Sequence, residues 1–112
     1  MPPTLSPPRV VCEKMHDMAV VLQVSVAPAT QAQFNELDAL VGQSMMQAGG
    51  PPDGLMSHVV YPDGAGFVIA EVWRAEAEGK AYIDVVLRSL INEAGLSAEE
   101  TTVRPVWSFA RP

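Results

Sequence analysis

The chain has 112 residues, a net charge of −6 at pH 7 and a pI of about 4.7, and this acidic balance without a Lys/Arg cluster argues against nucleic-acid partners and anionic membrane surfaces. With 48% hydrophobic and 18% charged residues, the composition is that of one folded domain rather than a disordered chain. No apolar run approaches the roughly 20 residues of a membrane span. The chain has a single cysteine, Cys12, which excludes an internal disulfide, so we expect a protein of the reducing cytoplasm.

The first seventeen residues are predicted to be a flexible tail that precedes a domain spanning residues 18–112. Four prolines among the first eight residues break regular structure and remove backbone donors. Residues 18–26 then predict a strand, because hydrophobic residues occupy every second position from Val20 to Val26.

A helix is predicted to begin after Thr30 and to end before Gly49. Thr30 is a good N-cap residue, and Gln33 stands at the position that completes a capping box. Hydrophobic residues recur at spacings of three and four and form one apolar stripe: Phe34, Leu37, Val41 and Met45.

The second half of the chain predicts two strands, a helix and a final strand. Residues 55–61 and 67–73 are expected to pair antiparallel, because only the turn-forming loop 62–66 joins them. A second helix is predicted over residues 75–94. The last strand is predicted over residues 101–109, where Pro105 indicates an edge position or a bulge.

The order strand, helix, strand, strand, helix, strand predicts a ferredoxin-like α+β sandwich, βαββαβ, with a four-stranded antiparallel sheet and both helices on one face. The other face needs its own cover, since residues 18–26 and 67–73 carry hydrophobic side chains on both faces. A second copy of the chain is the simplest cover, so we expect a homodimer. The alternative is a monomer with a partly apolar open face.

Several short motifs, taken in order, resemble the dimeric α/β barrel superfamily, in particular its small actinobacterial-type proteins of unassigned function. They are Gly-Pro-Pro-Asp-Gly-Leu at 50–55, His58, the turn at 63–66, Val-Trp-Arg at 72–74, Tyr82, Leu87, Leu90 and Ala94-Gly95. The resemblance covers residues 18–110. It implies a dimer whose two sheets face each other, forming an α/β barrel, and a cavity between the sheet and the helices of each protomer.

The superfamily includes cofactor-independent monooxygenases, polyketide cyclases, lactone isomerases and haem-handling enzymes. The resemblance therefore implies a small cofactor-independent enzyme of secondary metabolism, of cyclase, isomerase or monooxygenase type, acting on a hydrophobic or polyketide-like molecule. Similar monooxygenases commonly carry a histidine on the second helix, and residues 75–94 have none. Haem-handling members need an axial histidine, and this chain has only His16 and His58. Both departures from the family pattern argue against these two activities. The alternative is a non-catalytic protein that binds a small molecule or a partner.

His58 is the only histidine inside the predicted domain, and alternation places it on one face with Met56 and Val60. Histidine gives or takes a proton near neutral pH, so His58 is the candidate general acid or base, on an enolisable substrate. The alternative is a core histidine bonded to a backbone carbonyl or a water.

Glu71 lies between Ile69 and Trp73 on one face of the third predicted strand. A carboxylate with apolar neighbours is either paired or shifted toward its neutral form, so Glu71 is a catalytic candidate that orients His58 or binds a substrate hydroxyl. The alternatives are a dimer contact or a salt bridge to one of three arginines: Arg74, Arg88 or Arg104.

Tyr82 on the second helix is the third catalytic candidate, because its phenol could reach the same space. Four other residues are candidates for substrate binding: Phe67, Trp73, Met45 and Tyr61. For most of them, plain core packing is the alternative. No metal site is expected, because its ligands would have to gather around His58 alone, and without a phosphate-binding glycine motif no nucleotide cofactor is expected.

Overall fold

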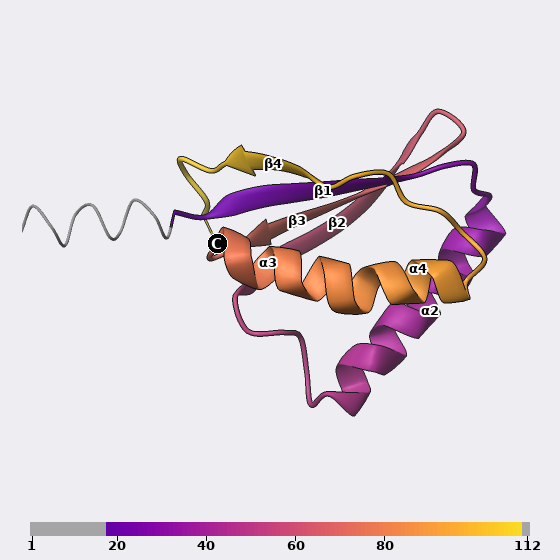
Figure 1. Ribbon diagram of the computed structural model, residues 1–112, viewed down its shortest axis with the longest axis horizontal. Helices are drawn as coiled ribbons and strands as arrows, with labels where there is room; N and C mark the ends of the chain where they lie inside the picture. The colour runs from indigo at the N-terminus through magenta and orange to yellow at the C-terminus, as the bar shows by residue number, and fades with distance from the viewer. Residues whose placement is uncertain (1–17, 111–112) are drawn as a thin grey trace, which may run out of the picture.

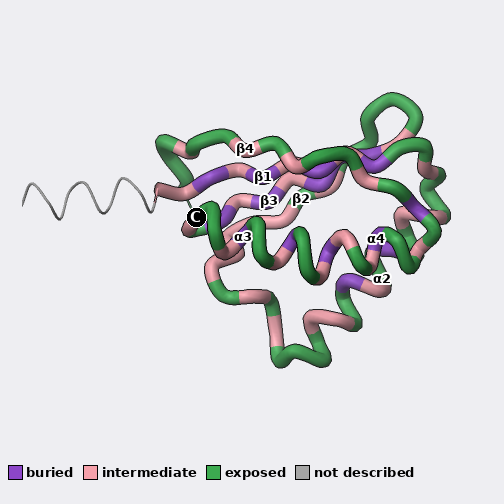
Figure 2. Tube along the Cα trace, viewed as in Figure 1, coloured by how far each residue is buried: buried purple, intermediate pink, exposed green. Residues whose placement is uncertain are grey.

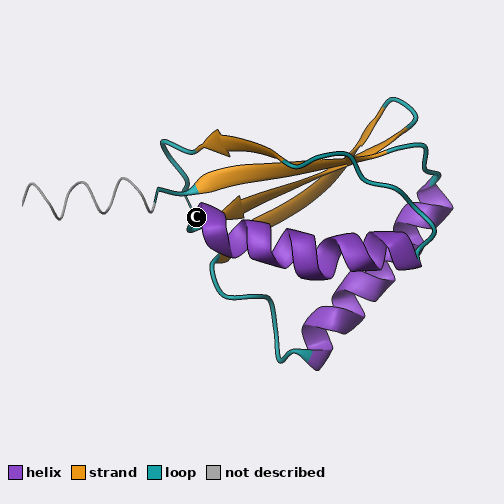
Figure 3. Cartoon of the chain, viewed as in Figure 1, coloured by secondary structure: helices purple, strands orange, loops and turns teal. Residues whose placement is uncertain are grey.

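A computed structural model describes residues 18–110 of the chain. The four strands form one antiparallel sheet in the order β2-β3-β1-β4, and the helices lie together on one of its faces (Figures 1 and 3). The predicted fold class, a ferredoxin-like α+β sandwich, is confirmed. The elements that form it are β1 (Val20–Val26), α2 (Gln31–Gln47), β2 (Leu55–Asp63), β3 (Gly66–Trp73), α3 (Glu76–Tyr82), η1 (Ile83–Leu87), α4 (Arg88–Glu93) and β4 (Thr102–Pro105). The predicted tail, with Cys12 and His16, lies outside the described residues.

The core lies between the sheet and the helices, where buried segments of β1, β3 and the helices face one another (Figure 2). Alternate residues of β1 are buried throughout, as its pattern predicts. The register pairs Leu22 with Glu71 and Val24 with Ile69, so these side chains share the face that the helices cover. The same register places one polar residue, Glu71, in the middle of an otherwise apolar layer.

The predicted capping box at the start of α2 is present. Gln33 N donates to Thr30 Oγ1 at 3.1 Å, and Thr30 N donates to Gln33 Oε1 at 2.9 Å. The predicted stripe faces the core, with Leu37 and Val41 buried and its two outer members, Phe34 and Met45, half-buried.

The hairpin between β2 and β3 is tighter than predicted. Both strands continue through the expected loop until Asp63 pairs with Gly66, so only Gly64 and Ala65 form the turn. Gly64 adopts a φ of +56°, which suits a residue without a side chain. Pro62 does not interrupt the pairing, because β2 is an edge strand and proline is tolerated there.

The second predicted helix is one continuous rod, α3–η1–α4, with a π-helical turn at η1 that the sequence pattern did not predict (Figure 1). The rod approaches the sheet closely at Gly79. A Cβ at this position would lie 2.5 Å from Leu22 Cδ1 and 2.7 Å from Trp73 Cγ. Glycine therefore sets the distance between the rod and the sheet.

The last strand is shorter than predicted, so the expectation that it continues to residue 109 is wrong. β4 ends at Pro105 on the edge of the sheet, which confirms the edge position. Val106 N still donates to Ala19 O at 2.9 Å, and beyond it the chain leaves the sheet. Trp107, predicted to be part of the strand, is 91% exposed.

The face of the sheet opposite the helices is not covered by any described segment of this chain. Valines from three strands lie on it, namely Val21, Val59, Val68 and Val72, as the register shows. The prediction that the first and third strands are apolar on both faces is confirmed. Among the described helices, none is long and apolar enough to cross a membrane.

Candidate functional site

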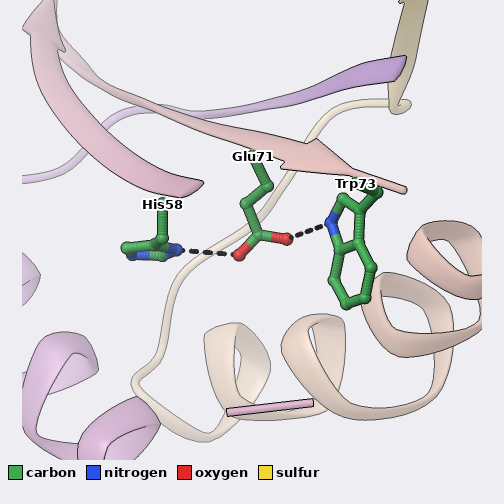
Figure 4. A network of polar contacts seen from close by, with 3 residues as sticks. All are labelled: His58, Glu71 and Trp73. Carbon is green, nitrogen blue, oxygen red and sulfur yellow. Dashed lines mark hydrogen bonds and ion pairs between the residues drawn. The ribbon is translucent and has the colours of Figure 1, made fainter. Parts of the chain in front are cut away.

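His58 and Glu71 lie side by side on neighbouring strands and extend from the sheet toward the helices (Figure 4). Their register pairs them directly, and His58 Nδ1 lies 2.8 Å from Glu71 Oε2. A β-bulge between Leu55 and Ser57 interrupts the alternation of β2. Consequently Leu55, and not the predicted Met56, is the residue before His58 that packs against the core on the same face of β2.

Glu71 is only 1% exposed, and both of its carboxylate oxygens accept hydrogen bonds. Oε2 accepts from His58, and Oε1 accepts from Trp73 Nε1 at 2.9 Å (Figure 4). A buried carboxylate is tolerated only when its oxygens are paired in this way. The first contact was predicted from the sequence and the second was not, although Glu71 and Trp73 stand two residues apart on one strand face.

The three arginines that could have paired with Glu71 lie elsewhere. Arg74 pairs with Glu78, and Arg88 with Asp84, both one helical turn away. Arg104 is exposed and aligns with Val21, on the opposite face of the sheet. The carboxylate of Glu71 therefore accepts hydrogen bonds from His58 and Trp73 and pairs with none of these arginines.

This arrangement assigns the proton of His58 and shifts its pKa. An indole N–H can only donate, and a carboxylate accepts, so the proton shared with Oε2 belongs to Nδ1, and in the neutral imidazole Nε2 is the acceptor. The hydrogen bond that His58 donates to Glu71 raises the pKa of His58 above 6.5; partial burial opposes this, and the charges of Glu71 and Asp38 add to it. The imidazole is 28% exposed, so its outer edge is within reach of a small molecule.

Tyr82 packs beside the same group of side chains. Its ring is tilted against Trp73 with centroids 5.5 Å apart. The hydroxyl is buried and has no hydrogen-bond partner among residues 18–110. Burial, followed by the charge of Glu71, raises the pKa of the phenol above 10, so the hydroxyl keeps its proton at neutral pH.

One hollow lies at each end of α2. The first, about 300 Å³, has Phe34, Val60 and Phe67 in its wall. The second, about 360 Å³, lies at the other end of α2 and has Met45 and Tyr82 in its wall. Neither lining includes His58, although Val60 is its next neighbour on the same face of β2.

The predicted substrate-binding residues are thus divided between the hollows and the core. Phe67 belongs to the first hollow and Met45 to the second, whereas Trp73 is fully buried between Glu71 and Tyr82. Tyr61 lies at the rim of the first hollow, but its hydroxyl is 3.4 Å from Gln23 Nε2, on the opposite face of the sheet. The loop residues that form the second hollow, residues 50–53, were noted in the sequence for turn formation and as part of the resemblance motif, and not as candidates for binding.

A metal centre has no visible basis in the described part of the chain, which contains no group of three or more His, Cys, Asp or Glu side chains suited to hold an ion. The only pairing of such residues at the site is His58 with Glu71. A protein zinc site uses three or four protein ligands, and His58 and Glu71 are only two, of which Glu71 already accepts a hydrogen bond from the Trp73 indole.

The sheet order and the helices on one face define a small ferredoxin-like α+β protein, in which a partly exposed histidine is paired with a buried glutamate between the sheet and the helices. No protein-family model and no curated protein matches this chain. Solved structures of the dimeric α/β barrel fold do match it, including proteins of the antibiotic biosynthesis monooxygenase family, so the resemblance noted in the sequence is confirmed for the fold.

Three of these structures illustrate the likeness. A protein of unknown function from Nitrosomonas europaea is 17% identical, with a TM-score of 0.57, and the match covers 87% of this chain and 97% of that one. A proposed antibiotic biosynthesis monooxygenase from Deinococcus radiodurans is 15% identical, with a TM-score of 0.54 and coverages of 85% and 98%. SnoaB, a cofactor-independent oxygenase from Streptomyces nogalater, is 12% identical, with a TM-score of 0.53 and coverages of 82% and 94%. At these identities the likeness concerns the fold and leaves the reaction open.

Proposed function

We propose that this protein is a small cofactor-independent enzyme that uses His58 as a general acid or base on a hydrophobic or polyketide-like molecule. The observation that carries the proposal is the 2.8 Å contact between His58 Nδ1 and the buried Glu71 carboxylate. The structural neighbours include a cofactor-independent oxygenase and proposed antibiotic biosynthesis monooxygenases, which favours this kind of chemistry.

The pair suits the removal of a proton from carbon or from a phenol. In the neutral ring, Nδ1 donates its proton to Glu71, so Nε2 can accept a proton from the substrate, and the carboxylate then stabilises the imidazolium that forms. Trp73 keeps the carboxylate oriented through its other oxygen. Cyclisation, isomerisation and cofactor-free oxygenation can all begin with such a deprotonation, so the geometry supports the shared first step.

Exchange of the acidic C–H groups of 2-tetralone for deuterium, followed by proton NMR in D₂O, tests this proposal without knowledge of the natural substrate. We expect the protein to accelerate the exchange and His58→Gln to lose the acceleration by about 10²-fold or more, the usual contribution of a general base. His16→Gln is the matched control and should exchange like the unaltered protein. Equal rates for His58→Gln and the control would exclude His58 as the base.

The dimer belongs to the same proposal. The open face of the sheet carries four valines, and a second copy placed sheet to sheet would bury them on both chains. Val68 is already almost fully buried by its neighbours, whereas Val59 is 53% exposed and would gain most from a partner.

A binding protein without catalytic activity is the second candidate function. The observation in its favour is that the walls of both hollows omit His58. In that case the histidine would serve as the partner that makes the burial of Glu71 tolerable. The exchange experiment separates the two functions, because a pure binder leaves the rate at its buffer value.

A further inference from the structure

The hollow at the end of α2 is formed by three separate parts of the chain. Its walls come from the last turns of α2, the loop that follows and the middle of the second helical rod. The loop is fixed in place, because Arg74 N donates to Gly54 O at 2.7 Å and Leu55 N donates to Pro52 O at 3.2 Å. The loop wall of the hollow is therefore in place before any ligand arrives, as is usual for small-molecule sites.

Its lining is mainly apolar and its charge is negative. Met45, Pro51, Pro52 and Val86 supply most of the apolar wall. Of the described residues that line it, Asp53 alone carries a charge, and the buried Glu71 lies close enough to influence Tyr82. An anionic ligand would meet like charge here, so the electrostatics favour an uncharged one.

Tyr82 lines this hollow, and its hydroxyl, which is shielded from solvent, lacks a partner among the described residues. It is buried, no acceptor among the described residues is within hydrogen-bond distance, and a buried donor left unpaired costs stability. The π-helical turn η1 begins at the next residue, and Tyr82 and Val86 line the hollow together. Short π-helical turns inside α-helices are rare and occur often at functional sites.

We propose that this hollow binds an uncharged, largely apolar molecule through one acceptor oxygen, which takes a hydrogen bond from the Tyr82 hydroxyl. Since the hydroxyl oxygen is shielded from solvent, a wall side chain must shift to admit the ligand, and Met45 with its flexible thioether is suited to do so. The inference rests on the proposed function only in taking the bound molecule to be the substrate; a binding protein would use the hollow in the same way.

Three naphthalenes of nearly equal shape test the proposal by ligand-observed NMR titration. They are 2-acetonaphthone, which offers a neutral carbonyl, 2-ethylnaphthalene, which offers no acceptor, and 2-naphthoate, which is anionic. We expect the ketone to bind the unaltered protein most tightly. Tyr82→Phe removes only the hydroxyl, so it should weaken ketone binding roughly three- to tenfold and leave 2-ethylnaphthalene within about twofold.

Ala48→Trp, which fills the hollow from an exposed position, should abolish binding of both neutral compounds, whereas the exposed Ala39→Trp, outside its lining, should not. The proposal is overturned if the ketone does not bind, if naphthoate binds more tightly, if Tyr82→Phe affects the ketone and the hydrocarbon equally, or if Ala48→Trp leaves binding intact. None of these outcomes contradicts the catalytic role of His58, which the deuterium-exchange experiment tests separately. Conversely, a His58→Gln protein that still binds the ketone but shows unchanged exchange contradicts only the proposed function.

Discussion

Trp73 donates its indole N–H to Glu71 across 2.9 Å, from two residues further along the same strand, and the other oxygen of Glu71 holds His58. The carboxylate is thereby fixed from both sides in a buried position. Glu71 therefore raises the pKa of His58 from a buried position that a small molecule does not need to contact. The consequences can be measured through the protonation of the histidine.

Replacement of Glu71 by glutamine should lower the pKa of His58. The hydrogen bond and charge of Glu71 raise that pKa, so their removal leaves burial, which lowers it, opposed only by the charge of Asp38, the smallest of the causes. A titration of the histidine C–H signals by NMR measures the change, with His16→Gln used to assign the two histidines. An unchanged His58 pKa in Glu71→Gln would show that the two side chains do not interact in solution.

The same pair predicts how stability depends on pH. Because the folded-state pKa of His58 is raised above its unfolded value of about 6.5, the ion pair contributes fully below pH 6.5 and is lost as the pH rises through the higher folded value. Urea denaturation midpoints, measured at intervals of about half a pH unit between pH 5.5 and pH 9, should show this loss of stability in the unaltered protein. Glu71→Gln should lack this dependence, and an equally steep one there would assign it to other groups.

The open face of the sheet predicts a dimer that a single charge can break. The chain mass is 12.0 kDa, so light scattering of the unaltered protein should give about twice this value. Val59→Asp, on the open face, should shift the mass toward the monomer, because the aspartate would be buried without a partner. Val85→Asp is the matched control: Val85 is 72% exposed on the second helical rod and should leave the dimer intact.

A monomer mass for the unaltered protein at micromolar concentration would refute the dimer. The same conclusion follows if Val59→Asp and Val85→Asp have equal masses. Since Val59 is already exposed in the single chain, its replacement should not unfold the protomer, and circular dichroism can confirm this before the masses are compared.

Two glycines within helices predict opposite effects of the same substitution. Gly79→Ala should destabilise the protein by about 1–3 kcal/mol, because the added methyl group would collide with Leu22 and Trp73. Gly42→Ala should stabilise it by about 0.5–1 kcal/mol, because nothing lies within 4 Å and alanine favours the helix. Urea denaturation compares them, and a stabilising Gly79→Ala would mean that the rod lies further from the sheet.

The amino-acid sequence by itself determined the order of the elements and the faces they bury. Local patterns were sufficient for this: the capping box at Thr30, the stripe along α2, and the alternation that puts Glu71 and Trp73 on one face of β3. Each depends on residues within a few positions of one another, so helix and strand periodicity predict them directly.

Only the tertiary structure decided which residues meet. The pairing of His58 with Glu71 depends on the register between β2 and β3, which the two-residue turn fixes from one end and the bulge after Leu55 alters at the other. A shift by a single residue would have turned His58 to the opposite face, because side chains alternate along a strand. The π-helical turn next to Tyr82 and the early end of β4 likewise follow from packing and edge contacts, which a local pattern does not contain.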